Sequence, residues 1–545
     1  MKARQKPGVV FQPHVHRRLQ RGIHQIVGAL RPTLGPLGGG VAIDHLNKTN
    51  PLPEYVEDAG VIARRLIELC DRDEDVGAML VRSMVLRQHT RLGDGTATAA
   101  AAVLFEAIFD AGVRYVAAGG NAMRLRYHLE HAIPCVLDML DTMAFRLEGR
   151  QALTQMARSL CHDDAMADLL GESFDLLGAY GRLEIREGYG RRLLREYVEG
   201  SHFYAGAVSK VLLPDDATAT LRLENAAIFL SDLTIQDHQT LFPILRSAHE
   251  ANVNALVIVA RDLSEKAVAL LATHNRMNKF RVVAVKLPGL NTEDRMAATE
   301  DLSLMTGAMP FLEVLGALPE SISEGQFGRA RRFWADLHSF GFVGGKGDPR
   351  KQREHIRRLK ARWQKTQDVD DRKPLQDRIG NLLGGAITLW VGGQSQPEIS
   401  ARKALAERAA LALRGAYEDG VVPGGGIAFL KCRDPLARQL NSIDAPEAHA
   451  AYRILVEALA APARTIWRNA GYDPGDVLSR LPHAGPDSAF DVVAGQVVDV
   501  REAGILDSAP VLKACARNAI SSAALALTID SVVHLSRPEM VGQSE

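Results

Sequence analysis

The chain has 545 residues, too many for one hydrophobic core, which predicts roughly two to four domains. Its composition, with 46% hydrophobic, 24% charged and 6% aromatic residues, is typical of a soluble globular protein. Lys and Arg total 65, as do Asp and Glu, so the net charge indicates neither a nucleic acid nor an anionic membrane as partner.

The N-terminal sequence, MKARQKPGVVFQPHVHRRL, lacks the apolar core of a signal peptide, and no apolar run approaches the roughly 20 residues of a spanning helix. An odd, scattered set of cysteines without a CxxC pair indicates reduced core thiols. These cysteines are Cys70, Cys135, Cys161, Cys432 and Cys515. We therefore expect a large cytoplasmic α/β protein.

The first stretch, to about residue 141, is predicted to be mostly helical. Val76, Leu80 and Met84 repeat at four-residue spacing, which predicts one apolar helix face. The alanine-rich sequence AAAAVLFEAIFDAGVRYVAAGG predicts a second helix that ends at Gly119 and Gly120.

In the middle of the chain, the spacing of apolar residues changes from a helical pattern to one that alternates short strands with helices. Two helical patterns separate three short runs rich in β-branched residues, at 227–232, 255–261 and 281–289. This β-α-β-α-β order predicts parallel strands with crossover helices. Residues 348–383 then predict a charged, solvated helical hairpin.

A strand is predicted at 384–393, between glycine pairs, and helices resume from about residue 400. The helical–α/β–helical order predicts a central domain inserted between flanking segments that fold back together.

Three segments are rich in the backbone N–H groups that suit phosphate. The turn Thr33-Leu34-Gly35-Pro36 is followed by more glycines, and Gly424-Gly425-Gly426 lets a backbone approach a ligand closely. In GDGTAT, residues 93–98, a helix start attracts anions, Thr96 and Thr98 offer hydroxyls, and Asp94 suits a hard cation such as Mg²⁺. Taken singly, such segments are more often ordinary turns or capped helix starts than phosphate sites.

Two common nucleotide motifs are absent. In GFVGGKGD, residues 341–348, Phe340 stands at the first glycine position of a Walker A motif, and Gly347 replaces its Ser/Thr. The first strand of the α/β region leads into SDLTIQD, without the Rossmann glycines. Both absences argue against a small-molecule ATPase or kinase.

In order along the chain, TLGP, EDAGVIARRLIEL, GDGTAT, YVEGSHFYAGAVSKVLL, VVAVKLPG, LLGGAITLWVGG, EDGVVPGGG and AGILD resemble successive landmarks of the group I chaperonins, the GroEL family. The resemblance implies a multidomain α/β chaperonin fold. Residues 1–141 and 420–545 would form a mostly helical equatorial domain, which binds ATP and forms the ring. Residues 142–198 and 386–419 would form a hinged intermediate domain, and 199–385 an α/β apical domain for clients and lid.

The same resemblance implies a homo-oligomer with seven-membered rings, single or double, that holds unfolded or partly folded client proteins and can take a co-chaperonin lid. It implies ATP and Mg²⁺ as cofactors, with Asp94 as metal ligand and Asp94 and Asp58 as catalytic acids. The implied ATP-binding residues are Thr33, Leu34, Gly35, Pro36, Asp94, Gly95, Thr96, Ala97, Thr98, Gly425, Asp491 and Asp507.

The chain departs from the family pattern in this pocket. The family's Lys-Asp-Gly turn corresponds to Glu57-Asp58-Ala59-Gly60, so that either Asp58 or Ala59 takes the aspartate position and an acid replaces the lysine. The family acid that orients water falls at Arg408, which cannot act as a base but suits a phosphate. These changes, with Ala97 in place of a threonine, predict weakened hydrolysis.

Positions that match the family's apolar client surface stay largely apolar, which fits the capture of exposed hydrophobic segments. We expect client contacts at Val211, Leu212, Phe242, Leu245 and Val268. The resulting hypothesis is a chaperonin subunit with reduced ATP hydrolysis and few clients, which assists folding or assembly. The alternative is a general, ATP-driven folding chaperonin with normal turnover.

Overall fold

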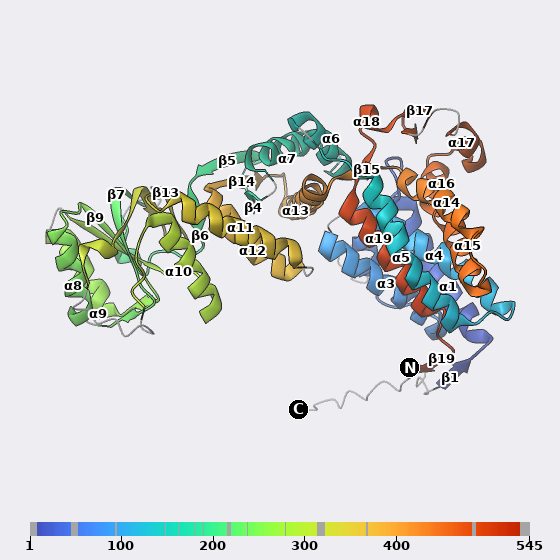
Figure 1. The fold of residues 1–545 in the computed structure, drawn as a ribbon, viewed down its shortest axis with the longest axis horizontal. Helices are drawn as coiled ribbons and strands as arrows, with labels where there is room; N and C mark the ends of the chain where they lie inside the picture. The colour runs from blue at the N-terminus through green and yellow to red at the C-terminus, as the bar shows by residue number, and fades with distance from the viewer. Residues whose placement is uncertain are drawn as a thin grey trace. The chain divides into compact units, whose positions relative to one another are not determined.

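The computed structural model describes residues 8–44, 53–92, 95–147, 149–161, 163–178, 180–188, 190–214, 220–236, 238–277, 280–312, 322–366, 369–481, 485 and 487–534. The chain divides into two compact units (Figure 1). Unit 1 comprises residues 1–175 and 401–545, and unit 2 comprises residues 176–400. The expected intermediate domain is not separated as a third body, so the three-domain boundaries remain a prediction.

Unit 1 is mostly helical. Its N-terminal part contains β1 (Gly8–Phe11), α1 (His14–Leu30), η1 (Arg31–Thr33), β2 (Val41–Ile43), β3 (Glu54–Val56), α2 (Ala59–Arg65), α3 (Arg72–Leu92), α4 (Gly95–Ala117), α5 (Ala122–Met143) and α6 (Gly149–Cys161), and leads into α7 (Asp164–Leu177).

The C-terminal part of unit 1 begins within α13 (Gln396–Asp419). It continues with β15 (Val421–Pro423), α14 (Ile427–Leu440), α15 (Pro446–Ala458), α16 (Ala461–Asn469), α17 (Pro474–Arg480), β16 (Ser488–Asp491), β17 (Gln496–Asp499), α18 (Val500–Ala503), β18 (Leu506–Ser508), α19 (Ala509–Ala526) and β19 (Ser531–His534).

The two ends of the chain meet in unit 1, as the helical–α/β–helical order predicts. Strand β1 pairs antiparallel with β19, where Gly8 lies opposite His534. Helix α19 packs against α4 and α5 (Figure 1). Its buried face is largely alanine, including Ala516, Ala519 and Ala523. Small side chains on this face, and on the alanine-rich α4, let the helices approach closely.

Helix α3 lies against α1, but its core face differs from the predicted stripe. Met84 is buried as expected, whereas Val76 and Leu80 are only half-buried. The buried face instead includes Ala78 and Val81. The four-residue spacing missed this face because its contact with α1 is made by small residues rather than by large apolar ones.

Unit 2 holds a mixed sheet of order β11-β9-β7-β12-β13-β6. Its strands are β6 (Ser201–Phe203), β7 (Leu221–Leu230), β9 (Ala255–Ala260), β11 (Arg281–Lys286), β12 (Gly328–Ala335) and β13 (Phe340–Gly345). Strands β7, β9 and β11 are parallel, with Val257 opposite Ile228 and Val283, which confirms the predicted β-α-β-α-β unit. The crossover helices are α8 (His238–Glu250) and α9 (Glu265–Met277), and α10 (Thr292–Thr306) follows β11.

Shorter elements complete unit 2: η2 (Lys210–Leu212), β8 (Thr234–Ile235), β10 (Asp262–Leu263) and η5 (Glu324–Gln326). The strand expected at 384–393 is β14 (Gly385–Val391), which joins β4 (Arg182–Glu187) and β5 (Leu194–Glu199) in a separate sheet of order β4-β14-β5. The chain passes between this sheet and β6 at Gly200, whose N–H donates to the carbonyl of Gly384 at 2.9 Å.

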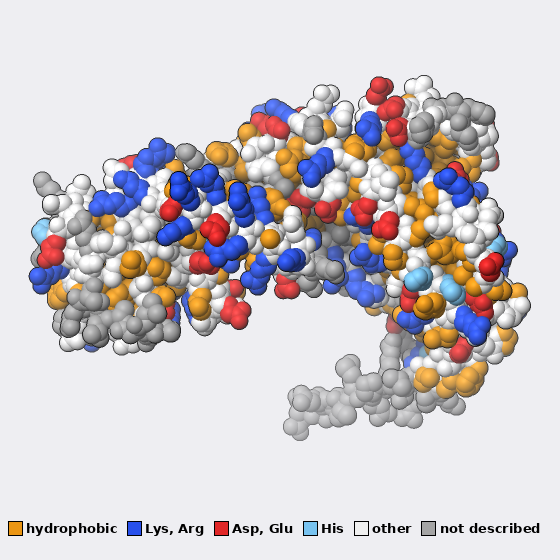
Figure 2. Space-filling model, viewed as in Figure 1, with side chains coloured by type: hydrophobic (Ala, Val, Ile, Leu, Met, Phe, Trp, Pro, Cys, Tyr) orange, Lys and Arg blue, Asp and Glu red, His pale blue; other side chains and the backbone are white. Residues whose placement is uncertain are grey.

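The predicted charged hairpin is α11 (Pro349–Lys365) with α12 (Val369–Leu383). Lys and Arg side chains gather over these helices (Figure 2). The exposed ones on α11 include Arg353, Arg357 and Arg358, while Leu359 and Trp363 face the core.

All five cysteines are free, and Cys161, Cys432 and Cys515 are buried. Among the residues that the structure describes, no helix combines the length and apolar character needed to cross a bilayer.

Candidate functional site

Unit 1 contains a cavity of about 470 Å³ where segments distant in sequence converge. They are the turn after α1, the first turns of α4, the end of α6, the glycine turn between β15 and α14, and the segment from β16 to β18. Many of the residues predicted from sequence line it: Leu34, Gly35, Pro36, Ala97, Gly425, Asp491 and Asp507.

The turn at 33–36 is held in place by α16. The side-chain amide of Asn469 donates to the carbonyl of Leu34 at 2.9 Å and to that of Arg31 at 2.8 Å. Gly35 has a φ of 98°, a conformation that favours glycine and that this turn requires. Thr33 does not line the cavity, because its hydroxyl donates back to the carbonyl of Leu30 at 2.8 Å.

Two aspartates, Asp491 and Asp507, also line the cavity. Asp507 lies on β18, opposite Val422 of β15, so this strand pair fixes its position beside Gly425. The carboxylate of Asp491 accepts hydrogen bonds from the N–H groups of Val493, at 2.8 Å, and Ala494, at 3.2 Å. Asp491 is therefore oriented by the backbone of its own loop.

The start of α4 forms another edge of the cavity. Ala97 lines it, and the carbonyl of Ala97 accepts a 3.1 Å hydrogen bond from the side chain of Gln88. The side chain of Thr98 is fully buried and does not line the cavity, so its hydroxyl is not placed to meet a ligand there. Asp94 and the side chain of Thr96 lie outside the described residues, so the predicted metal ligand remains a prediction.

The side chain of Asp58 reaches the start of α4. A Cβ atom placed on Gly95 would lie 2.9 Å from Asp58 Oδ2. The carboxylate accepts from the Val61 N–H at 2.9 Å and lies 3.0 Å from His89 Nε2 and 3.2 Å from Arg408 Nη2. Burial raises the pKa of Asp58, but His89, Arg408 and the Val61 N–H together lower it to about 2. The carboxylate is therefore charged and fully partnered at neutral pH.

This geometry bears on the two possible alignments of the Glu57-Asp58-Ala59-Gly60 turn. Asp58 caps the N-terminus of α2, whereas Ala59 is buried as the first residue of that helix. Glu57 is exposed. Of the two candidate positions, only Asp58 carries a functional group to the start of α4.

Sequence reasoning missed part of the cavity. Helix α6 contributes Gln155, Arg158 and Ser159, none of which belongs to a glycine motif. The apolar lining was also missed, and includes Phe429, Ile466, Phe490, Val493 and Ile505. Nothing local in the sequence marks these residues, because the tertiary packing alone brings them to the cavity.

A second, open cavity of about 1060 Å³ lies along α8 in unit 2. Phe242 and Leu245, both predicted to bind clients, line it. Phe242 is 52% exposed, whereas Leu245 is only 7% exposed and belongs largely to the core. Polar side chains also line this cavity, including His249 and His274.

The other predicted client residues lie off this cavity. Val211 is exposed on η2, which packs against α9, the helix that carries Val268. Val268 is half-buried against the core. Leu212 is 4% exposed, so its side chain is a core residue and not a surface contact, because η2 turns it toward the sheet.

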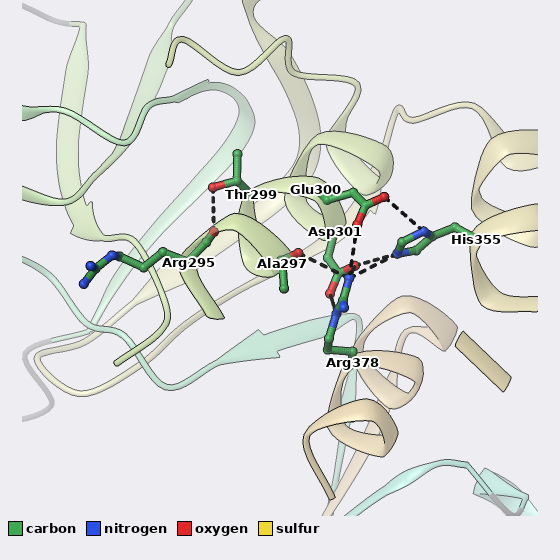
Figure 3. Close-up of polar contacts among 7 residues, drawn as sticks. All are labelled: Arg295, Ala297, Thr299, Glu300, Asp301, His355 and Arg378. Atoms are coloured by element: carbon green, nitrogen blue, oxygen red, sulfur yellow. Dashed lines mark hydrogen bonds and ion pairs between the residues drawn. The ribbon is translucent and has the colours of Figure 1, made fainter. Parts of the chain in front are cut away.

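One cluster among the described residues has the composition of a metal site: Glu300 and Asp301 of α10 with His355 of α11 (Figure 3). His355 Nε2 lies 2.9 Å from Asp301 Oδ1. However, the guanidinium of Arg378, from α12, donates to both oxygens of Asp301 at 2.7 and 2.8 Å. The guanidinium of Arg378 thus supplies the positive charge that a metal ion would bring to these carboxylates. The cluster links α10, α11 and α12.

Comparison with known proteins places these features in a family. The family model described as TCP-1/cpn60 chaperonin family matches residues 211–537. The fold is similar to that of the chaperonin gp146 from the bacteriophage EL 2 (Pseudomonas aeruginosa), crystallised in the presence of ATP-BeFx. Crystal forms I and II give TM-scores of 0.71 and 0.63, each at 18% identity and covering 97% of this chain and 99% of that one. Because this family model matches more than half of the chain's residues, the chain belongs to the TCP-1/cpn60 chaperonin family.

Proposed function

We propose that this chain is the subunit of a cytoplasmic ring chaperonin that binds ATP in the cavity of unit 1 and captures non-native proteins on unit 2. The observation that carries the proposal is the convergence of the TLGP turn, the start of α4, Gly425, Asp491 and Asp507 on one cavity. Backbone N–H groups and a helix start suit phosphates, the apolar wall suits a base, and the aspartates suit ribose hydroxyls.

We further propose that hydrolysis is slow. A general base works best when its pKa lies near the working pH, whereas the pKa of Asp58 is about 2, because His89 above all, with Arg408 and the Val61 N–H, outweighs the raising effect of burial. Arg408 itself cannot accept a proton. The oxygens of Asp58 are already partnered, so Asp94 is left as the proposed Mg²⁺ ligand, which would supply charge neutralisation at the phosphates.

Calorimetric titration with ATP and Mg²⁺, combined with mass photometry and steady-state turnover, tests this function. We expect ATP binding and an assembly of roughly 400 or 800 kDa, for seven or fourteen subunits of 59.3 kDa. We expect turnover well below that of a general folding chaperonin. Absence of ATP binding, or a monomer with and without nucleotide, would refute the proposal, while ordinary turnover would favour the general folding chaperonin.

Client capture is expected to depend on Phe242. Because this side chain is half-exposed and lines the open cavity, Phe242→Ser should leave unit 2 folded but weaken capture of a denatured client roughly tenfold. Suppression of aggregation of a chemically denatured test protein measures the effect.

Leu290→Ser is the matched control, because Leu290 is exposed in unit 2 but does not line the cavity. Leu245→Ser is unsuitable, since a polar group at this buried position would destabilise the unit itself. Equal loss of capture in the Phe242 and Leu290 variants would place the client surface elsewhere.

A further inference from the structure

The ion pair between Arg408 and Asp58 lies beside the nucleotide cavity without being part of its wall. Their side chains are 23% and 20% exposed, so the pair is sheltered but not sealed from solvent. Arg408 lies on α13, one helical turn before Ala412. Ala412 packs against Ala97, and Ala97 lines the cavity. A guanidinium is therefore held one turn from the edge of the cavity, at the start of α4.

We propose that Arg408 is a phosphate-binding residue, which exchanges Asp58 for the terminal phosphate of a bound nucleoside triphosphate. The inference rests on the proposed nucleotide site and adds a residue that sets its preference for a triphosphate over a diphosphate. No covalent bond is made or broken in this exchange. One anion replaces another in front of the same guanidinium.

The surroundings of Asp58 favour such an exchange. When Arg408 leaves Asp58 Oδ2, the other carboxylate oxygen, Oδ1, keeps the Val61 N–H at 2.9 Å and His89 Nε2 at 3.0 Å, so the carboxylate retains two of its three partners. A buried charge without partners would make the departure of Arg408 costly, and the two contacts at Oδ1 reduce that cost. Arginine also presents a planar fork of donors that binds phosphate oxygens in pairs, and it remains charged throughout.

The test compares ATP and ADP binding by calorimetry in the full chain and its variants. Arg408→Gln should weaken ATP binding about tenfold, as expected for one lost charge-assisted contact, while ADP binding changes less than about twofold. Arg408→Lys should recover part of the loss. Asp58→Asn removes the competing anion, so it should tighten ATP binding, opposite in sign to Arg408→Gln.

Arg402→Gln is the matched control. Arg402 lies on the same helix and forms a similar ion pair with Asp163, at 2.9 Å and with side chains 26% and 28% exposed. Its loss should leave the ratio of ATP to ADP affinity unchanged. If the parent chain binds neither nucleotide, the proposed function fails. If it binds both and Arg408→Gln lowers the two affinities equally, or neither, the role of Arg408 is overturned.

Discussion

Gly22→Ala should destabilise unit 1 by about 3 kcal/mol or more, because it overpacks the contact between α1 and α3. A Cβ atom at Gly22 would lie 1.7 Å from the carbonyl oxygen of Glu74 and 3.1 Å from the N atom of Ala78. The reciprocal contact is equally tight, since a Cβ atom at Gly77 would lie 2.2 Å from the carbonyl oxygen of Leu19. These neighbours are backbone atoms, so no side-chain rotation can relieve the clash, and the two helices must separate.

Gly28→Ala provides the control on the same helix. No atom lies within 4 Å of a Cβ atom at Gly28, which is exposed. Alanine there should stabilise the helix by about 0.5–1 kcal/mol. Chemical denaturation followed by circular dichroism compares the two variants. Similar, small changes in both would show that α1 and α3 do not pack through Gly22.

The fold could be predicted from sequence where the signal is local. The β-branched runs at 227–232, 255–261 and 281–289 became the parallel strands β7, β9 and β11, since their length and the helices between them allow little else. The core face of α3 was predicted less well. Its contact with α1 uses Gly77 and Ala78, and small residues leave no hydrophobic period to detect.

The candidate site was predictable through its glycine motifs and through the family resemblance, which added Asp491 and Asp507. Leu34, Gly35 and Gly425 lie in turns that the local sequence predicts, and all three line the cavity. Arg158 of α6 gave no such signal. Leu212 shows the opposite error, since its apolar character fits a client surface and a core equally well, and only the structure distinguishes the two.

The ion pair between Asp58 and Arg408 joins residues 350 positions apart in sequence, so no local pattern could have paired them. Weakened hydrolysis was predicted from the resemblance to the chaperonins, because Arg408 stands at the position of a family acid, and it stays a prediction. The structure adds a physical argument for this prediction: arginine cannot accept a proton, and it joins His89 in lowering the pKa of the neighbouring Asp58 carboxylate.

Reversing this arrangement should raise ATP turnover. In Arg408→Asp combined with Glu57→Lys, position 408 gains a carboxylate that can orient or deprotonate water, a role that arginine cannot fill. The exposed position of Glu57, next to Asp58, then carries a cation near the phosphates. General-base assistance is typically worth about 10²–10⁴-fold, so we expect kcat to rise at least tenfold even if the geometry is imperfect.

Turnover must be measured at saturating ATP, because loss of Arg408 is expected to weaken ATP binding while the new acid raises kcat. Arg408→Gln is the matched control, since it removes the arginine without adding a base, and its kcat should stay near that of the parent chain. Arg408→Asp alone should give less than the double variant, because groups that act as a unit are not additive. An unchanged kcat in the double variant, with ATP still bound, would mean that the slow step lies outside the Asp58–Arg408 pair.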